Sequence, residues 1–280
     1  MRRLLASVTA ALALLSLTTD AQAAEPLTYV ALGDSYSAAS GVLPPDPAAP
    51  PLCLRSTRNF AHVIAQRTGA RLTDVSCGAA ETRHFTTAQY PGVPPQLAAL
   101  EADAGLVTMT IGGNDGGVFI GALLACGTAG IATLGHGSPC EDLYGSRFED
   151  TVRTTTYPAL VSALTAVRNK APQARIAILG YPWILPPATG CFDKMPVAKG
   201  DVAYLRSLQA TLNDAVARAA AATGATYVDM GQASEGHDAC QPLGVRWIEP
   251  VLQTTNPVVV HPNALGEANM ATQVMRVLGL

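Results

Sequence analysis

Short apolar stretches rich in β-branched residues alternate along the chain with longer stretches of helical periodicity, which predicts strands alternating with helices. The predicted strands are residues 28–32, 71–77, 106–111, 175–179 and 226–230. The predicted helices are residues 57–68, 94–102 and 147–170, a helix capped by Asp201 and closed by Gly224, and a last helix capped by Asn263 that runs to about Val277. This alternation is typical of an α/β/α sandwich, in which helices cover both faces of a parallel sheet in a flavodoxin-like arrangement.

Four stretches depart from this pattern. Residues 41–51 contain too many prolines for a helix or a central strand, and residues 182–200 and 231–260 read as long irregular connections. Residues 118–132 are apolar but interrupted by glycines, so we expect a cleft wall there and not a core helix. We find no internal repeat, and residues 25–280 are expected to form one domain.

The first predicted strand runs directly into Gly33-Asp34-Ser35, which places a serine at the carboxyl end of a strand. Ligands bind at that edge of open α/β sheets. Taken alone, Gly-Asp-Ser is more often a plain turn, because a serine nucleophile also needs a base and donors for the oxyanion. Three later motifs change this interpretation: Ser76-Cys77-Gly78, Gly112-Gly113-Asn114-Asp115 and His261-Pro262-Asn263.

With these four motifs in this order, the chain resembles the SGNH (GDSL-type) hydrolases, and especially secreted actinobacterial lipases and esterases. The resemblance implies a sheet of order 2-1-3-4-5 and a serine esterase without a cofactor or metal. It makes Ser35 the nucleophile and His261 the base. The backbone N–H groups of Ser35 and Gly78 and the side-chain amide of Asn114 would form the oxyanion hole.

One position departs from the family pattern. Many members carry an Asp three residues before the catalytic histidine, and Val258 stands there in this chain. A main-chain carbonyl can fix the histidine tautomer instead. We therefore predict a Ser35–His261 dyad in which a carbonyl of residues 256–259, most plausibly that of Val258, replaces the carboxylate. The competing carboxylates are Asp229, Asp238 and Glu249.

Residues 1–24 carry two arginines, an apolar run and an Ala-Gln-Ala site, as a secretory signal peptide does. The apolar run is shorter than the roughly 20 residues of a membrane span, so we expect an exported protein without stable membrane insertion. With 18 basic and 21 acidic residues, the chain offers no basic surface for a nucleic acid.

All six cysteines lie in the predicted exported part, which suggests three disulfides in an oxidising compartment. Six cysteines allow 15 pairings. With sheet order 2-1-3-4-5, neighbouring cysteines in the sequence meet at one sheet edge, which favours Cys53–Cys77, Cys126–Cys140 and Cys191–Cys240. A zinc site is disfavoured because neither C-x₂-C nor H-E-x-x-H spacing occurs.

For the substrate, we expect a small-molecule or lipid ester with an acyl chain, acted on by a monomer. The alternatives are a carbohydrate deacetylase on the same fold and a catalytically silent binding protein. Deacetylation of polysaccharide is disfavoured because Trp183 and Trp247 are the only tryptophans available for stacking on sugars.

Overall fold

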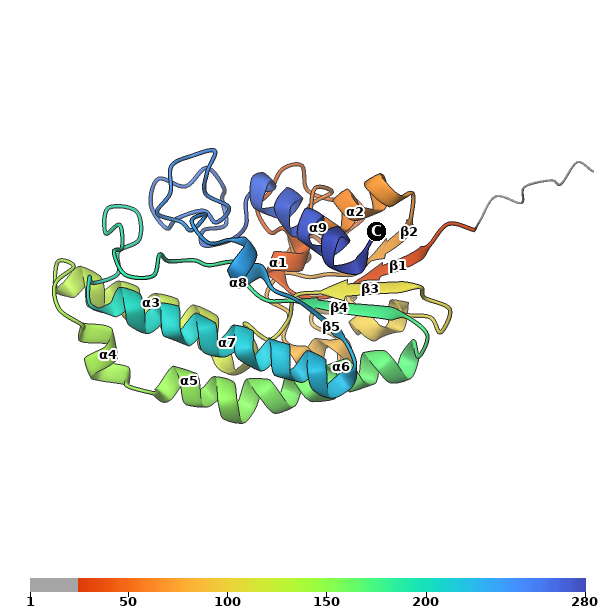
Figure 1. The fold of residues 1–280 in the computed structure, drawn as a ribbon, viewed down its shortest axis with the longest axis horizontal. Helices are drawn as coiled ribbons and strands as arrows, with labels where there is room; N and C mark the ends of the chain where they lie inside the picture. Colours follow the sequence, from red (N-terminus) through yellow and green to blue (C-terminus); the bar gives the residue numbers. More distant parts are fainter. Residues whose placement is uncertain (1–24) are drawn as a thin grey trace, which may run out of the picture.

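The computed structural model describes residues 25–280, so the predicted signal peptide lies outside the described residues. Five parallel strands form the central sheet (Figure 1). Their bounds are β1 Thr28–Ala31, β2 Arg71–Asp74, β3 Leu106–Met109, β4 Arg175–Leu179 and β5 Thr226–Val228. The order β2-β1-β3-β4-β5 confirms the prediction. All strands except β4 end one to three residues before their predicted ends.

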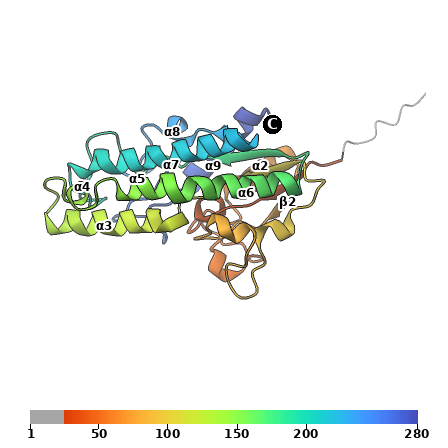
Figure 2. The same cartoon turned by 90° about the horizontal axis from the view of Figure 1, so that it is seen from below.

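Alternate residues of the strands face two separate cores, as the period of two in a strand requires. Tyr29 and Ala31 of β1 pack under α2 (Phe60–Thr68) and α9 (Ala264–Leu278). Val30 and Leu32 belong to the larger core under α6 (Tyr157–Lys170) and α7 (Asp201–Thr223). Figures 1 and 2 show the two helical layers, with α6 and α7 lying side by side.

The other helices lie mainly beyond the carboxyl edge of the sheet, where α7 projects past the strands (Figure 1). They are α1 Ser35–Ala38, α3 Val118–Ala132, α4 Pro139–Tyr144, α5 Arg147–Thr151 and α8 Met230–Ala233. Short 3-10 turns occupy Pro51–Cys53, Thr82–Phe85, Gln96–Ala99 and Asp115–Gly117. A π-helical turn, Val152–Thr156, joins α5 to α6 just before Pro158, so the predicted helix over 147–170 is divided into two α-helical parts.

The prediction for residues 118–132 was wrong about secondary structure, because they form the continuous helix α3. One of its glycines serves packing, because a Cβ on Gly130 would stand 2.4 Å from the carbonyl oxygen of Pro196. Among the described residues, Asp115–Ala132 is the segment whose length and mean hydropathy of 1.5 would also suit a membrane span. In this fold the inner side of α3 faces α7 and lines a cavity described below.

Three other helix predictions needed correction. Asp201 does not cap its own helix, because Gly200 occupies the cap position; the carboxylate accepts hydrogen bonds from the N–H groups of Cys140 and Glu141, both at 3.0 Å, and so caps α4. The predicted helix over 94–102 is a single 3-10 turn. Asn59 caps α2, which shortens the predicted 57–68 helix at its start.

Three disulfides link the cysteines in the pairs expected from the sequence: Cys53–Cys77, Cys126–Cys140 and Cys191–Cys240. Cys126 lies in α3 and Cys140 in α4, so this bridge joins two helices and not two ends of one loop. The Cys191–Cys240 bridge spans 49 residues, the largest separation of the three.

Candidate active site

Ser35 is the first residue of α1, immediately after the turn that follows β1. Gly33 makes this turn with a φ of +121°, where a Cβ would lie 2.4 Å from the carbonyl oxygen of Thr110. A side chain there would therefore push β1 away from the β3 end. The carboxylate of Asp34 caps α1 by accepting the N–H of Tyr36 at 3.0 Å. No described group accepts the N–H of Ser35, which leaves this donor free at a helix start.

His261 lies beside Ser35 although 226 residues separate them in the chain. Its Nε2 is 2.8 Å from the Ser35 Oγ, and its Nδ1 is 2.7 Å from the main-chain carbonyl oxygen of Val259. A carbonyl only accepts, so Nδ1 carries the proton and Nε2 is left to accept from the serine hydroxyl. The structure thus places a carbonyl from the predicted segment on Nδ1, but from Val259 and not Val258.

The loop before His261 explains this choice. Val260 has a φ of +58°, an uncommon left-handed conformation for a β-branched residue, and this turns the preceding carbonyl back toward the imidazole. The hydroxyl of Tyr36 donates to the Val260 carbonyl at 2.8 Å, and Glu249 exchanges main-chain hydrogen bonds with Val260 and His261. Because Tyr36 directly follows Ser35, its hydrogen bond to Val260 links the turn that carries the nucleophile to the loop that carries His261.

None of the competing carboxylates contacts His261. Asp229 caps α8 through the N–H of Gln232, and Asp238 accepts the N–H of Cys240. Glu249 is fully buried and pairs with Arg246 at 2.8 Å, which helps to hold its pKa below the ordinary value despite burial. These carboxylates therefore support the loops that carry His261 without touching its ring.

The other four histidines have their own partners or surroundings away from Ser35. His62 lies on α2 and contacts Asn59, and His84 accepts the N–H of Glu81. His237 donates to the Val245 carbonyl and stacks on Trp247, while His136 is exposed. His261 is thus the histidine that the fold brings to the nucleophile.

Burial shifts the pKa values of two titratable groups at this edge, the imidazole of His261 and the carboxyl group of Asp34. Burial lowers the pKa of His261, and the Val259 carbonyl partly offsets this by favouring the protonated ring. Burial raises the pKa of Asp34 to about 6, although hydrogen bonds from Tyr181 and Thr110 oppose the shift. The Tyr181 hydroxyl also accepts the N–H of Gly113 at 2.9 Å, so it ties the serine turn to the Gly-Gly-Asn turn.

The two remaining predicted site residues, Asn114 and Gly78, differ in whether they have a hydrogen-bond donor left for a substrate. Asn114 donates one amide hydrogen of Nδ2 to the Ala80 carbonyl at 3.0 Å and keeps a second hydrogen without a described acceptor. Gly78 is buried, and its N–H already donates to the Cys53 carbonyl at 2.8 Å. The predicted oxyanion donor, the N–H of Gly78, is therefore already bonded in this structure, because the segment around Cys53 is held against it by the Cys53–Cys77 disulfide.

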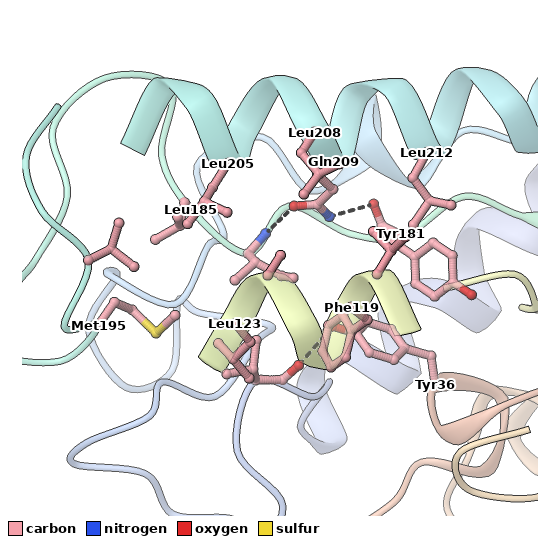
Figure 3. A pocket seen from close by; sticks show the side chains of 15 residues that line it. Tyr36, Phe119, Leu123, Tyr181, Leu185, Met195, Leu205, Leu208, Gln209 and Leu212 are labelled. Atoms are coloured by element: carbon pink, nitrogen blue, oxygen red, sulfur yellow. Dashed lines mark hydrogen bonds between the residues drawn. The ribbon is translucent and has the colours of Figure 1, made fainter. Parts of the chain in front are cut away.

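An apolar cavity of about 80 Å³, shown in Figure 3, is lined by the residue after Ser35 and the residue before His261. Tyr36, Val260 and Phe119 line its end near the pair, and the Phe119 ring lies edge-on to His261 with centroids 5.9 Å apart. The side chains of α3 and α7 form the facing walls, and Met195 lies at the far end (Figure 3). The amide of Gln209 is used up by the main chain of residues 181, 182 and 184. The surface that a bound group would contact in this cavity is therefore almost entirely apolar.

Within residues 25–280, no cluster of three or more His, Cys, Asp or Glu side chains is arranged to hold a metal ion. Sequence reasoning missed Tyr36 and Tyr181, which join the catalytic turns. Their position after the first and fourth strand ends was a usable signal, because tyrosines there can bond across the sheet edge.

The chain is similar to known proteins in both sequence and fold. Residues 31–268 match the family model described as GDSL-like Lipase/Acylhydrolase family. Lipase 2 of Streptomyces coelicolor is 63% identical over 262 residues, which cover 93% of this chain and 88% of that protein. The structure is similar to that of phospholipase A1 from Streptomyces albidoflavus NA297, with a TM-score of 0.75, 27% identity, and coverage of 91% and 99%. It is also similar to the extracellular lipase from Streptomyces rimosus, with a TM-score of 0.72, 26% identity, and coverage of 90% and 98%.

Proposed function

The chain belongs to the GDSL-like lipase/acylhydrolase family and is a carboxylic ester hydrolase; from this premise we propose that it cleaves esters whose acyl chain enters the cavity between α3 and α7, by a Ser35–His261 dyad. The observation that supports the dyad most strongly is the hydrogen bond of 2.8 Å between Ser35 Oγ and His261 Nε2, with Nδ1 already occupied by a carbonyl. The cavity beside this pair supports the substrate class.

In the proposed reaction, Ser35 Oγ attacks the ester carbonyl carbon while its proton passes to His261 Nε2. The tetrahedral intermediate collapses, the bond to the alcohol oxygen breaks, and His261 Nε2 gives its proton to the departing alcohol. Water then attacks the acyl-enzyme with His261 again as the base, which releases the carboxylic acid and restores Ser35. The carbonyl of Val259 holds the ring in one tautomer throughout.

The size and lining of the cavity favour acyl chains over acetyl groups. Its volume of about 80 Å³ is several times the roughly 10–15 Å³ that one water-sized group requires, so it accommodates several carbon atoms without side-chain movement. Each buried methylene contributes about 0.8 kcal/mol. An acetyl group would fill only a small part of this apolar cavity, which disfavours the carbohydrate deacetylase alternative.

We further propose that the protein is exported and acts as a monomer on small-molecule or lipid esters. The three disulfides support an oxidising compartment, and residues 1–24 have the composition of a signal peptide. A phospholipid is one candidate lipid, since a similar solved structure is a phospholipase A1.

The test combines covalent labelling with a chain-length series. A fluorophosphonate probe should label the enzyme at Ser35, and Ser35→Ala should abolish both labelling and turnover while folding normally. Across p-nitrophenyl esters, kcat/KM should rise from acetate to medium-length chains. Labelling at another residue, or more than a few per cent of wild-type turnover in Ser35→Ala, would refute the dyad. A maximum at acetate would refute the acyl cavity, and no labelling or turnover at all would favour a catalytically silent binding protein.

A further inference from the structure

We infer that the main-chain N–H of Ala79, and not that of Gly78, is the second backbone donor of the oxyanion hole. This inference rests on the proposed ester hydrolysis by Ser35 and identifies which atoms stabilise its tetrahedral intermediate. It assigns a catalytic contact to a residue that the Gly-Asp-Ser, Gly and Asn motifs pass over.

The first observation is that Gly78 has a structural task. Its N–H donates to the Cys53 carbonyl at 2.8 Å, and the Cys53–Cys77 disulfide holds the two segments together next to this bond. A Cβ on Gly78 would meet the same carbonyl oxygen at 3.0 Å and the Ser40 Oγ at 3.1 Å. The glycine is therefore required for close packing of the two segments, and using its N–H on a substrate would break a buried hydrogen bond.

The second observation concerns the next residue. Ala79 has a φ of +60°, a left-handed conformation that is unfavourable for an alanine. Ala79 is also exposed to solvent. Among the described residues no group accepts its N–H, whereas the neighbouring N–H of Ala80 donates to the Cys77 carbonyl at 3.2 Å. A strained backbone with a free donor is common at functional sites, where strain aims a group at a ligand.

The third observation places this turn at the site. The N–H of Cys77 donates to the Gly33 carbonyl at 3.0 Å, two residues before Ser35. On the other side, Asn114 Nδ2 donates to the Ala80 carbonyl at 3.0 Å, and the Thr82 N–H donates to Asp115 at 3.1 Å. Ala79 therefore lies in a turn anchored both to the serine strand and to the Asn114 turn.

Three donors without described acceptors thus belong to adjoining segments: the N–H of Ser35, the N–H of Ala79 and the second amide hydrogen of Asn114. An oxyanion that forms when Ser35 Oγ attacks needs donors of this kind, already fixed before the reaction. The side chain of Ala79 takes no part, so the identity of this residue in the sequence gives little indication of its role.

Backbone substitution tests the inference directly. Lactic acid in place of Ala79 converts the amide into an ester, which deletes the N–H and keeps the methyl group; glycolic acid in place of Gly78 does the same one residue earlier. We expect kcat/KM for p-nitrophenyl butyrate to fall by about 10²–10³ for the first protein and by less than tenfold for the second. The reverse order, or an equal loss in both, would overturn the inference.

Two controls keep the result interpretable. The ester at position 79 also weakens the Gly78 carbonyl, which accepts Gln89 Nε2 at 2.7 Å, so Gln89→Ala should lose less than about threefold for the inference to hold. Ala79→Gly keeps the N–H and relieves the left-handed strain, so it should raise Tm by a few degrees. A lower Tm in Ala79→Gly would contradict the strain on which the inference draws.

A second readout does not depend on making the backbone esters. In ¹⁵N-labelled protein inhibited at Ser35 by a small phosphonate, the phosphoryl oxygen occupies the oxyanion position, and the Ala79 amide proton should move strongly downfield while that of Gly78 stays in place. A shift at Gly78 alone would assign the donor to Gly78. Failure of Ser35 to react at all would instead count against the proposed hydrolysis.

Discussion

Two neighbouring regions of the molecule solve opposite physical problems. The edge of the sheet that carries Ser35 and His261 is polar, and fixed hydrogen bonds hold its side chains in place around the three donors that have no described acceptor. The cavity between α3 and α7 is lined by aliphatic and aromatic carbon, and its one amide is occupied by the main chain. Ester cleavage and the choice of acyl chain therefore depend on different residues, so substitutions in one region should impair one of these properties without the other.

The largest effect is expected from the base itself. His261→Ala should lower kcat by on the order of 10³ or more, because no other described group is placed to accept the Ser35 proton. Asp229→Asn, Asp238→Asn and Glu249→Gln should each cost less than about tenfold, since none touches the imidazole. Steady-state kinetics on a short ester, with circular dichroism to check folding, measures this. A folded amide variant as inactive as His261→Ala would reveal a carboxylate triad.

A smaller, selective effect should follow from changing the cavity. Leu123→Asp puts a charge into its wall and should reduce kcat/KM for octanoate esters by about ten- to a hundredfold while sparing acetate esters. Leu124→Asp is a matched control, since the adjacent Leu124 side chain on α3 is 61% exposed and does not line the cavity. Equal losses across the chain-length series, or equal losses in both variants, would place the acyl site elsewhere.

Loss of the Cys191–Cys240 disulfide should lower both the stability of the fold and, more modestly, the activity. Cys191→Ala with Cys240→Ala should lower the free energy of unfolding by roughly 2–4 kcal/mol. Activity should also fall several-fold, because residues 191–195 bond to the loop leading to His261, where the N–H of Leu252 donates to the Lys194 carbonyl at 2.9 Å. Denaturation curves and kinetics of this variant are compared with Cys126→Ala/Cys140→Ala. A greater loss of activity in the latter pair would contradict this role.

The smallest predicted effect is a displacement of the pH profile. Catalysis needs neutral His261, and burial lowers its pKa below the ordinary 6.5, so the acidic limb of kcat/KM should have its midpoint below 6.5. Activity is then retained at mildly acidic pH. The buried Asp34, whose pKa is raised to about 6, titrates nearby, so the ¹⁵N shift of the His261 imidazole should assign the limb. A His261 titration midpoint at or above the ordinary 6.5 would contradict the burial argument.

The polar edge was largely predictable from the sequence, because its motifs sit where strands end and parallel strands end at one edge. Ser35 and Asn114 were placed in this way, whereas the role of His261 and the sheet order followed from the resemblance to the SGNH hydrolases. The choice of Val259 over Val258 was not predictable, since it depends on the left-handed turn at Val260. The donor at Ala79 was hidden for the same reason, because a backbone N–H has no signature in a side chain.

The cavity was predictable only in outline. The apolar residues 118–132 indicated a wall, but their glycines hid a helix, and one of them, Gly130, permits its close approach to residues 196–198. Its other wall comes from α7, about 80 residues later in the chain, and no local pattern pairs the two helices. Tyr36 and Tyr181 also escaped prediction, because their hydrogen bonds cross between segments far apart in the sequence.

The most direct test of the account is a crystal structure of the enzyme inhibited by a p-nitrophenyl octylphosphonate. Ser35 Oγ attacks phosphorus and p-nitrophenolate leaves, so the adduct carries an alkyl chain in place of the acyl chain. The account predicts phosphorus bonded to Ser35 Oγ, with the alkyl chain lying between α3 and α7 and reaching toward Met195. A chain that lies outside on the surface while the cavity stays closed would contradict it.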